Sequence, residues 1–370
     1  MRQNPLLICL AALFLSSIAN AQQVCFTAQE RARAEQRAKV YRAPDPGYDP
    51  VLGYNPTLGP RRGAPPADAN GVARRLNCVP NKDEKPGAGT TPKFHCSVAG
   101  VTDEAGNLIR YKIKPHFKGQ STDKRNGEIY GEFLSSRFSK ALGFFADDEW
   151  VADVNCPDCE KSLTKSYQGA RFTGFEPAAG IELSLGRGID VNCNGKDSGS
   201  LAESLQKISA SGARAEVDAF KLWLAFIDHG DTKTDNHKFA CLKSRKNADN
   251  TRVCDEPVFY VSDMGSTFGF SSASEKKARL DTWKKKEPIV VKDGTCTANA
   301  KSVGDTHISE AGRKLLADNL QTLLNAEQQN QTITKVFRAS RNAERDRPAE
   351  EWSAEFIRKA RTIIDARCTN

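Results

Sequence analysis

Residues 229–236 form a short segment whose side chains suit phosphoryl transfer. That chemistry needs a carboxylate near the attacking group, a nearby cation, and oxygen ligands for a divalent metal ion. Asp231 can accept the proton of an attacking hydroxyl group, and Lys233 can neutralise charge on the transferred group. Asn236 and Asp263 offer the oxygen atoms that Mg²⁺ prefers. We therefore predict Asp231 and Lys233 as catalytic residues, and Asn236 and Asp263 as metal ligands.

A lysine on a strand followed by a glutamate on a helix supplies the second half of such a site. Lys112 and Lys114 both lie in an alternating run, and residues two apart in a strand share a face, so periodicity does not choose between them. Glu128 and Glu132 both lie in the helical run that follows. One lysine would reach the phosphates of a nucleotide, and one glutamate would orient it through an ion pair.

The elements that must position these residues can be predicted from periodicity. An apolar stripe at helical spacing predicts a helix over residues 213–227, directly before the loop. Strands are predicted at 237–242 and 258–262, with Asp263 directly after the second. Further upstream we predict strands at 93–98, 108–117, 150–154 and 169–173, a helix at 127–143, and a strand-like connector at 175–189.

The last third of the chain is predicted to be mostly helical. Residues 264–304 look irregular, with Trp283 and Cys296 as anchors. Ser309 is a helix N-cap before an apolar run, a second helix includes Ile333 to Phe337, and a third begins at Pro348.

The N-terminus and the cysteines predict an exported protein. Arg2, an apolar run at 6–18 and a small-x-small site ending at Ala21 are typical of a secretory signal peptide. Without Cys9, ten of the 11 cysteines remain, and an even number in an exported chain favours disulfides. We predict a Cys241–Cys254 disulfide, because the two residues bracket a polar insertion between strands.

Composition excludes some classes of partner. The hydrophobic fraction of 39% is ordinary for a soluble chain, and no stretch after the signal approaches membrane-spanning length. The net charge of +8 is dispersed among many acidic residues, so we expect no nucleic-acid partner. The expected location is periplasmic or secreted.

The loop resembles the catalytic loop of protein kinases. His229-x-Asp231-x-Lys233-x-x-Asn236 matches four positions of that pattern, and Asp263-Met-Gly is similar to the metal-binding Asp-Phe-Gly. The surrounding pattern is closer to HipA-type, phosphoinositide and secretory-pathway kinases, in which a Lys-Pro strand end precedes a Glu-x-x-x-x-Arg helix. The chain more closely resembles a family of exported bacterial proteins of unknown function with this kinase-like core, over roughly residues 88–370.

The resemblance implies an α+β, two-lobed, protein-kinase-like fold with disulfides, having a small sheet-plus-helix N-lobe and a mostly helical C-lobe. It favours Lys114, which precedes Pro115, and Glu132, which has the expected spacing to Gly143. No glycine-rich phosphate-binding motif precedes Lys114. The expected divisions are a signal peptide at 1–21, a Pro/Gly-rich extension at 22–88, an N-lobe at 89–175, a C-lobe core at 176–304 and a C-terminal helical segment at 305–370.

The function implied is a phosphotransferase that uses ATP with Mg²⁺ or Mn²⁺ and an acceptor that is a protein, a lipid or a small molecule. Two alternatives use the same fold. One is an AMP transferase, and the other is a catalytically inactive binding module. The presence of all five site residues, including Lys114 and Glu132, argues against the inactive module.

Overall fold

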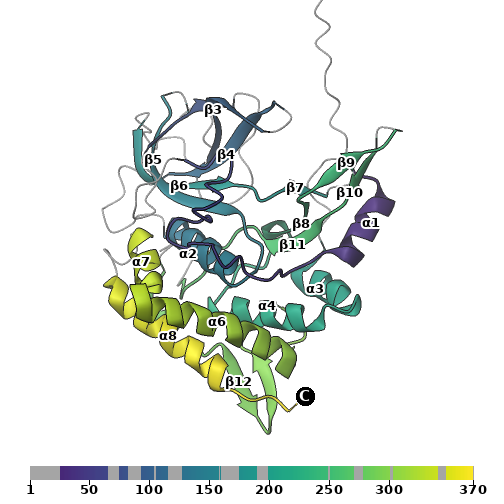
Figure 1. Ribbon diagram of the computed structural model, residues 1–370, viewed down its shortest axis with the longest axis vertical. Coiled ribbons are helices and arrows are strands. Elements are labelled where there is room, and N and C mark those ends of the chain that lie inside the picture. The colour runs from purple at the N-terminus through teal and green to yellow at the C-terminus, as the bar shows by residue number, and fades with distance from the viewer. Residues whose placement is uncertain are drawn as a thin grey trace, which may run out of the picture.

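The protein is a mixed α+β structure in which a sheet-rich part stands above a helix-rich part (Figure 1). The computed structural model describes residues 26–65, 75–81, 93–103, 106–115, 127–157, 159, 175–189, 199–248, 251–270, 278–300, 303–340 and 347–369. The predicted signal peptide at 1–21 and the predicted strand at 169–173 lie outside these residues. No helix in the described part is long and apolar enough to cross a membrane.

A six-stranded sheet carries the predicted site lysine. Its spatial order is β1-β5-β6-β4-β3-β2. The strands are β1 (Arg75–Asn77), β2 (Val79–Pro80), β3 (Phe94–Thr102), β4 (Leu108–Lys114), β5 (Asp148–Asn155) and β6 (Phe175–Leu183). The predicted strands at 93–98, 108–117 and 150–154 are therefore present, and the predicted connector at 175–189 contributes β6. Alternation along β4 buries Ile109, Tyr111 and Ile113 on the side facing the core of the sheet.

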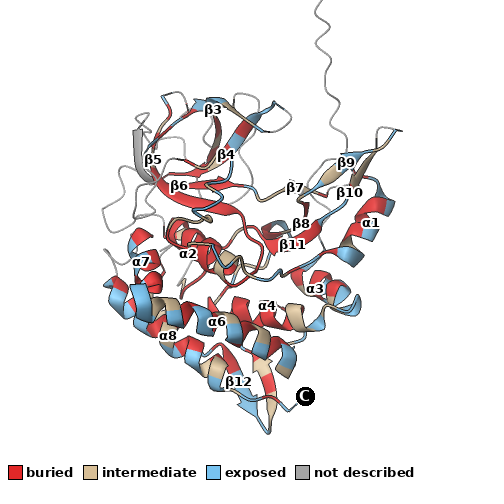
Figure 2. Cartoon of the chain, viewed as in Figure 1, coloured by how far each residue is buried: buried red, intermediate tan, exposed pale blue. Residues whose placement is uncertain are grey.

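Helix α2 (Glu128–Ala141) packs against β5 and β6 and is buried over most of its length (Figures 1 and 2). It begins and ends within the predicted range of 127–143. Gly143 follows with a φ of 87°, a conformation that glycine adopts without steric cost and that ends the helix.

The helix-rich part is built around α4 (Arg214–Phe226), whose residues from Val217 onward are all buried. Its neighbours are α3 (Leu201–Ala210), α6 (Glu310–Asn330), α7 (Thr332–Ala339) and α8 (Ala349–Asp365). Helices α4, α6, α7 and α8 were predicted, and Ser309 caps α6 as expected by accepting from the Gly312 N–H. Helix α3 was missed, although Ser200 and Glu203 form a capping box readable in the sequence.

Two smaller sheets lie beside these helices. Strands β7 (Arg187–Gly188), β8 (His237–Cys241) and β11 (Pro257–Val261) form one of them. Between β8 and β11, the hairpin of β9 (Ser244–Lys246) and β10 (Arg252–Cys254) is closed by the predicted Cys241–Cys254 disulfide. The other described disulfides are Cys78–Cys96, Cys156–Cys159 and Cys296–Cys368.

Residues 278–300 are more regular than the sequence suggested. They contain α5 (Leu280–Lys284) and a hairpin of β12 (Ile289–Lys292) and β13 (Thr295–Ala298), joined to β14 (His307–Ile308). The prediction of an irregular segment was wrong here, because Asp293 and Gly294, with φ of 51° and 75°, form the kind of two-residue turn that closes hairpins. Trp283 is fully buried and Cys296 is disulfide-bonded, so both are anchors as predicted.

Candidate functional site

The predicted lysine and glutamate form a buried ion pair. Lys114 ends β4 and Glu132 lies in the middle of α2, and both side chains are almost fully buried. The Nζ of Lys114 donates to Oε1 of Glu132. The alternative lysine, Lys112, pairs instead with Glu182 on β6. The structure therefore selects Lys114 and Glu132 as the pair.

Asp263 joins this pair from the other half of the molecule. It lies two residues beyond Val261, the last residue of β11, and its Oδ1 lies 3.6 Å from Nζ of Lys114. Its side chain keeps 33% of its surface exposed, so one side of the carboxylate faces solvent. Lys114 thus links a buried carboxylate on α2 to a partly exposed carboxylate after β11.

The segment after Asp263 packs tightly on α2. A Cβ placed on Gly131 of α2 would lie 2.6 Å from the carbonyl oxygen of Gly265. There is therefore no room for a larger residue at position 131. The hydroxyl groups of Ser135 and Thr267 are hydrogen-bonded at 3.1 Å. These contacts fix the Asp263 segment relative to the helix that carries Glu132.

The predicted catalytic loop is bonded to the same segment. The N–H groups of Ser262 and Asp263 donate to the carbonyl oxygen of Asn236 at 2.7 and 3.3 Å. The Gly230 N–H donates to the carbonyl oxygen of Ser266 at 3.2 Å. Within the loop, Nδ2 of Asn236 donates to the backbone oxygen of Asp231 at 3.0 Å. The loop is therefore tied to both sides of Asp263.

Asp231 and Lys233 lie at the exposed edge of the loop. Their side chains form an ion pair at 3.0 Å, with 28% of Asp231 and 77% of Lys233 exposed. The hydrogen bond that Lys233 donates to Asp231 raises the pKa of Lys233, and the charge of Asp263 raises it further. The Asp231–Lys233 pair thus lies on the solvent side of the site.

Burial and charge set the ionisation of the central groups. Burial opposes the charge on Asp263, but Lys114 and Lys112 hold the pKa of Asp263 well below its usual range. Burial likewise opposes the charge on Lys114, but Asp263 and Glu132 hold its pKa well above normal. Burial raises the pKa of Glu132, and the charge of Lys114 lowers it. Asp263, whose carboxylate is partly exposed, is thus anionic at neutral pH.

His229 is a structural residue by its surroundings. It is 5% exposed, and neither ring nitrogen has a hydrogen-bond partner among the described residues. Burial lowers the pKa of His229 to about 4, so the ring is neutral at pH 7. Its backbone N–H donates to the carbonyl oxygen of Leu224, in the last turn of α4, at 3.0 Å.

Two charged residues that sequence reasoning did not place in the site lie near it. Carboxylate oxygens of Glu149, Glu132 and Glu182 lie within 4.8 Å of one another in the interior of the sheet-rich part. Lys93 is close enough for Lys112 and Lys114 to lower its pKa, in addition to the effect of burial. Glu149 follows Asp147 and Asp148, and such an acidic run usually indicates a solvated turn, so no sequence signal pointed to it.

The donor set fits a hard divalent cation. Asp263 supplies an ionised, partly exposed carboxylate, and Asn236 supplies an amide on the segment bonded to it. Oxygen ligands of this kind are the ones Mg²⁺ and Mn²⁺ take. Lys114 would face the anionic phosphates of a metal-bound nucleotide, where a lysine acts as a point charge.

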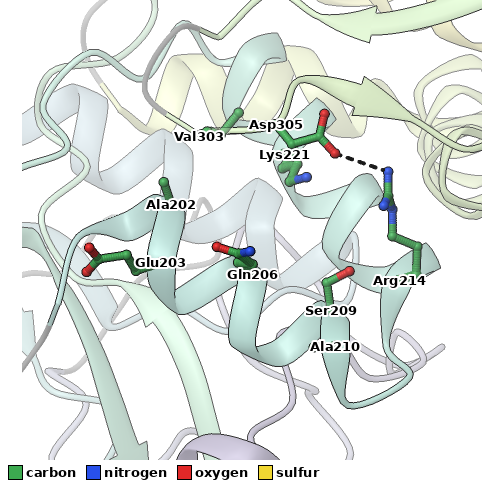
Figure 3. Close-up of a pocket in the computed structure, with 10 residues that line it drawn as sticks. Ala202, Glu203, Gln206, Ser209, Ala210, Arg214, Lys221, Val303 and Asp305 are labelled. Carbon is green, nitrogen blue, oxygen red and sulfur yellow. Dashed lines mark hydrogen bonds and ion pairs between the residues drawn. The ribbon is translucent and has the colours of Figure 1, made fainter.

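A separate cavity of about 440 Å³ lies between α3, α4 and residues 303–305 (Figure 3). Two cations line it, but both are already paired. Arg214 binds Asp218 and Asp305, and Nζ of Lys221 lies 3.6 Å from Asp218. Among the residues that line this cavity, both cations are therefore compensated by carboxylates.

Comparison with known proteins does not identify the function of the chain. No protein-family model matches the chain, and no curated protein matches it either. Among solved structures, the chain is similar to the crystal structure of CtkA, a proinflammatory kinase from Helicobacter pylori. The two are 11% identical with a TM-score of 0.40, over 79% of this chain and 98% of that one. We therefore base the function on the contacts described above.

Proposed function

We propose that the protein is an exported, kinase-like phosphotransferase that uses ATP with Mg²⁺ or Mn²⁺. The observation that carries the proposal is the position of Lys114 between Glu132 and Asp263, on three separate elements of the chain. A buried lysine held by one carboxylate and facing a second, partly exposed one is the arrangement with which protein kinases bind a metal-bound nucleotide. In this proposal the sheet-rich and helix-rich parts are the N-lobe and C-lobe of a kinase-like fold.

Each residue has a role that its surroundings support. Lys114 would bind the α- and β-phosphates, and Glu132 would hold Lys114 in place. Asp263 and Asn236 would hold the metal ion, which neutralises charge on the phosphates when bound. The backbones of these two residues are held next to each other, because the Asp263 N–H donates to the Asn236 carbonyl oxygen.

The exposed edge of the loop would carry out the transfer. The acceptor's hydroxyl oxygen forms a bond to the γ-phosphorus while the bond to the leaving ADP breaks. Asp231 accepts the hydroxyl proton late in this step, and Lys233 neutralises charge on the transferred group. The exposure of both side chains fits an acceptor that approaches from solvent, whether a protein, a lipid or a small molecule.

Export is proposed from the signal-like N-terminus and agrees with the described disulfides, which persist in oxidising compartments. Phosphoryl transfer in the periplasm or outside the cell requires that ATP reach the enzyme there. The proposal therefore requires that both the acceptor and a source of ATP are present in the periplasm or outside the cell.

Nucleotide binding by the oxidised mature protein tests the proposal. We expect ATP to raise the melting temperature in the presence of Mg²⁺ or Mn²⁺ and to have less effect with a chelator. Transfer is then followed with ATP labelled at the γ- or α-phosphorus. Label from the γ-position supports a kinase, whereas label from the α-position supports the AMP transferase. No shift with any nucleotide, with or without metal, would contradict both enzyme functions.

A further inference from the structure

An N-terminal segment, residues 41–63, crosses from the end of α2 to the six-stranded sheet, and we call it the strap. It follows α1 (Ala28–Arg37), which packs on α3 and β11, and passes over α2 toward the sheet (Figure 1). At its start, the Arg42 N–H donates to the carbonyl oxygen of Gly143 at 2.9 Å. At its end, Tyr111 of β4 donates its hydroxyl proton to the Gly63 carbonyl oxygen at 2.7 Å. The strap therefore contacts both α2 and the strand of Lys114.

The centre of the strap rests on Arg137 of α2. The side chain of Arg137 is buried, donates to the Glu149 carbonyl oxygen at 3.0 Å, and has its guanidinium 4.8 Å from the ring centre of Phe133. A Cβ placed on Gly53 would overlap the Arg137 guanidinium. Gly53 has a φ of 84°, so glycine is required there for both conformation and space.

Acidic side chains and a tyrosine of the strap and of β5 influence the ionisation of this arginine. Burial lowers the pKa of Arg137, and Tyr48, Asp148, Glu149 and Asp49 act in the opposite direction. Asp49 also closes the turn that presents Gly53, because its side chain accepts from the N–H groups of Val51 and Leu52 at 2.8 and 3.2 Å. The strap is thus a folded turn built against one side chain of α2.

Arg137 and Glu132 lie on different sides of α2. They are five positions apart, which at 3.6 residues per turn places them about 140° apart around the helix axis. Glu132 faces Lys114, whereas Arg137 faces the strap. Every residue from Ile129 to Ser139 is buried, so the strap helps to enclose a helix that also packs on the sheet. A displacement of the strap would therefore be transmitted to the glutamate through the helix.

We infer that the strap positions the proposed nucleotide site, with Arg137 as a positioning residue that acts on Glu132 through α2. The effect on nucleotide affinity rests on the proposed function, whereas the effect on α2 does not. Residues that are distant in sequence from the catalytic loop would then control whether the Lys114–Glu132 pair is formed.

A matched pair of glycine substitutions tests this inference. Gly53→Ala forces the strap away from Arg137. Gly59→Ala introduces a similar backbone strain, since its φ is 78°, but its Cβ meets no atom within 4 Å. We expect faster amide hydrogen exchange in α2 for Gly53→Ala than for Gly59→Ala. We also expect faster acetylation of the buried Lys114 by acetic anhydride, followed by mass spectrometry. Equal exchange and equal Lys114 labelling in the two variants would overturn the inference.

Nucleotide affinity adds a readout that general destabilisation would not reproduce. We expect Gly53→Ala to weaken ATP binding in Mg²⁺ by about tenfold relative to Gly59→Ala. In a Glu132→Gln background, the same substitution should have no further effect, because the strap acts through Glu132. An equal loss in both backgrounds would contradict that route. If the unmodified protein binds no nucleotide, the proposed function fails, and the exchange and labelling comparison still decides the inference.

Discussion

The ammonium group of Lys114 lies 3.6 Å from a carboxylate oxygen of Asp263, although Lys114 ends β4 of the six-stranded sheet and Asp263 follows β11 of another sheet. The same ammonium is paired with Glu132 on α2. Because removal of any one of the three charges leaves another buried charge without its partner, each should affect both stability and ligand binding.

The first prediction distinguishes Lys114 from Lys112. Lys114→Met should abolish the ATP-dependent rise in melting temperature, whereas Lys112→Met should retain most of it, because Lys112 is paired with Glu182 and not with Asp263. Both variants should lose roughly 3 to 5 kcal/mol of stability, since each leaves a buried carboxylate unpaired. Thermal shift and isothermal titration calorimetry on both variants measure the difference.

A double variant tests whether Lys114→Met loses ATP binding only because it fails to fold. Lys114→Met combined with Glu132→Leu removes both buried charges and should recover much of the lost stability without restoring ATP binding. If the double variant bound ATP as the unmodified protein does, Lys114 would have no role in the site.

The second prediction concerns the metal ion. Asp263→Asn should remove the dependence of ATP binding on Mg²⁺ and weaken that binding by at least about tenfold, about 1.4 kcal/mol, because the amide carries no charge. Asp255→Asn is a suitable control, because Asp255 makes an exposed ion pair with Arg245 in the β9–β10 hairpin. Titration with ATP at fixed Mg²⁺ and with chelator measures the effect, and identical behaviour of both variants would contradict the assignment.

Much of the site could be predicted from sequence because its residues follow strongly periodic elements. The helical stripe of α4 placed the loop, and alternation along β4 placed a lysine beside α2. Periodicity did not choose between Lys112 and Lys114, because both are on one face of the strand. Their distinction arises from pairing across the sheet, where Lys112 lies opposite Glu182.

The strap could not be predicted from the sequence for a physical reason. It has no apolar periodicity, and it is held by single contacts such as Arg61 with Asp148 at 2.8 Å and Tyr111 with Gly63. The space that Gly53 leaves for the Arg137 guanidinium is visible only in the folded structure. By contrast, α3 and the β12–β13 hairpin have local sequence signals. These are a capping box for the helix and an Asp-Gly turn for the hairpin.

The third prediction is a pH dependence of stability in the metal-free protein. Burial lowers the pKa of His229 to about 4, against about 6.5 in the unfolded chain. Because the unfolded state binds this proton more readily, the contribution of His229 is fully present above pH 6.5 and is lost as pH falls toward 4. The full effect is of order 3 kcal/mol.

Denaturant unfolding between pH 4 and 8 measures this contribution. His229→Gln should flatten the curve between pH 4 and 6.5 relative to the unmodified protein. A slope that is the same in the His229 variant as in the unmodified protein would show that another group causes the acid sensitivity.

The fourth prediction compares two disulfides. Cys296–Cys368 closes a loop with a sequence separation of 72 and ties the C-terminal segment to the β12–β13 hairpin, whereas Cys241–Cys254 spans 13. In the chain-entropy description, loss of the first costs about 4 kcal/mol and loss of the second about 3 kcal/mol. Paired Cys→Ser variants, unfolded in denaturant under oxidising conditions, should therefore show the larger loss for Cys296 and Cys368.

The last prediction concerns the close approach of α6 to α4. A Cβ on Gly312 would lie 2.5 Å from the Cβ of Asp218 and 2.8 Å from the carbonyl oxygen of Ala215. Asp218 is fully buried and accepts hydrogen bonds from the N–H and hydroxyl groups of Ser309 at 3.0 and 2.7 Å. The N-terminus of α6 is thus fixed to α4 by its cap, and Gly312 allows the contact.

Gly312→Ala should destabilise the protein by about 1 to 3 kcal/mol, although alanine is the better helix former, because the backbone atoms of α4 cannot give way. Thr322→Ala, at an exposed position of α6, is the control and should change stability by less than about 0.5 kcal/mol. Denaturant unfolding compares the two. A stabilising effect of Gly312→Ala would mean that α6 can move away from α4, and the cap of Ser309 on Asp218 would then not fix the position of the helix.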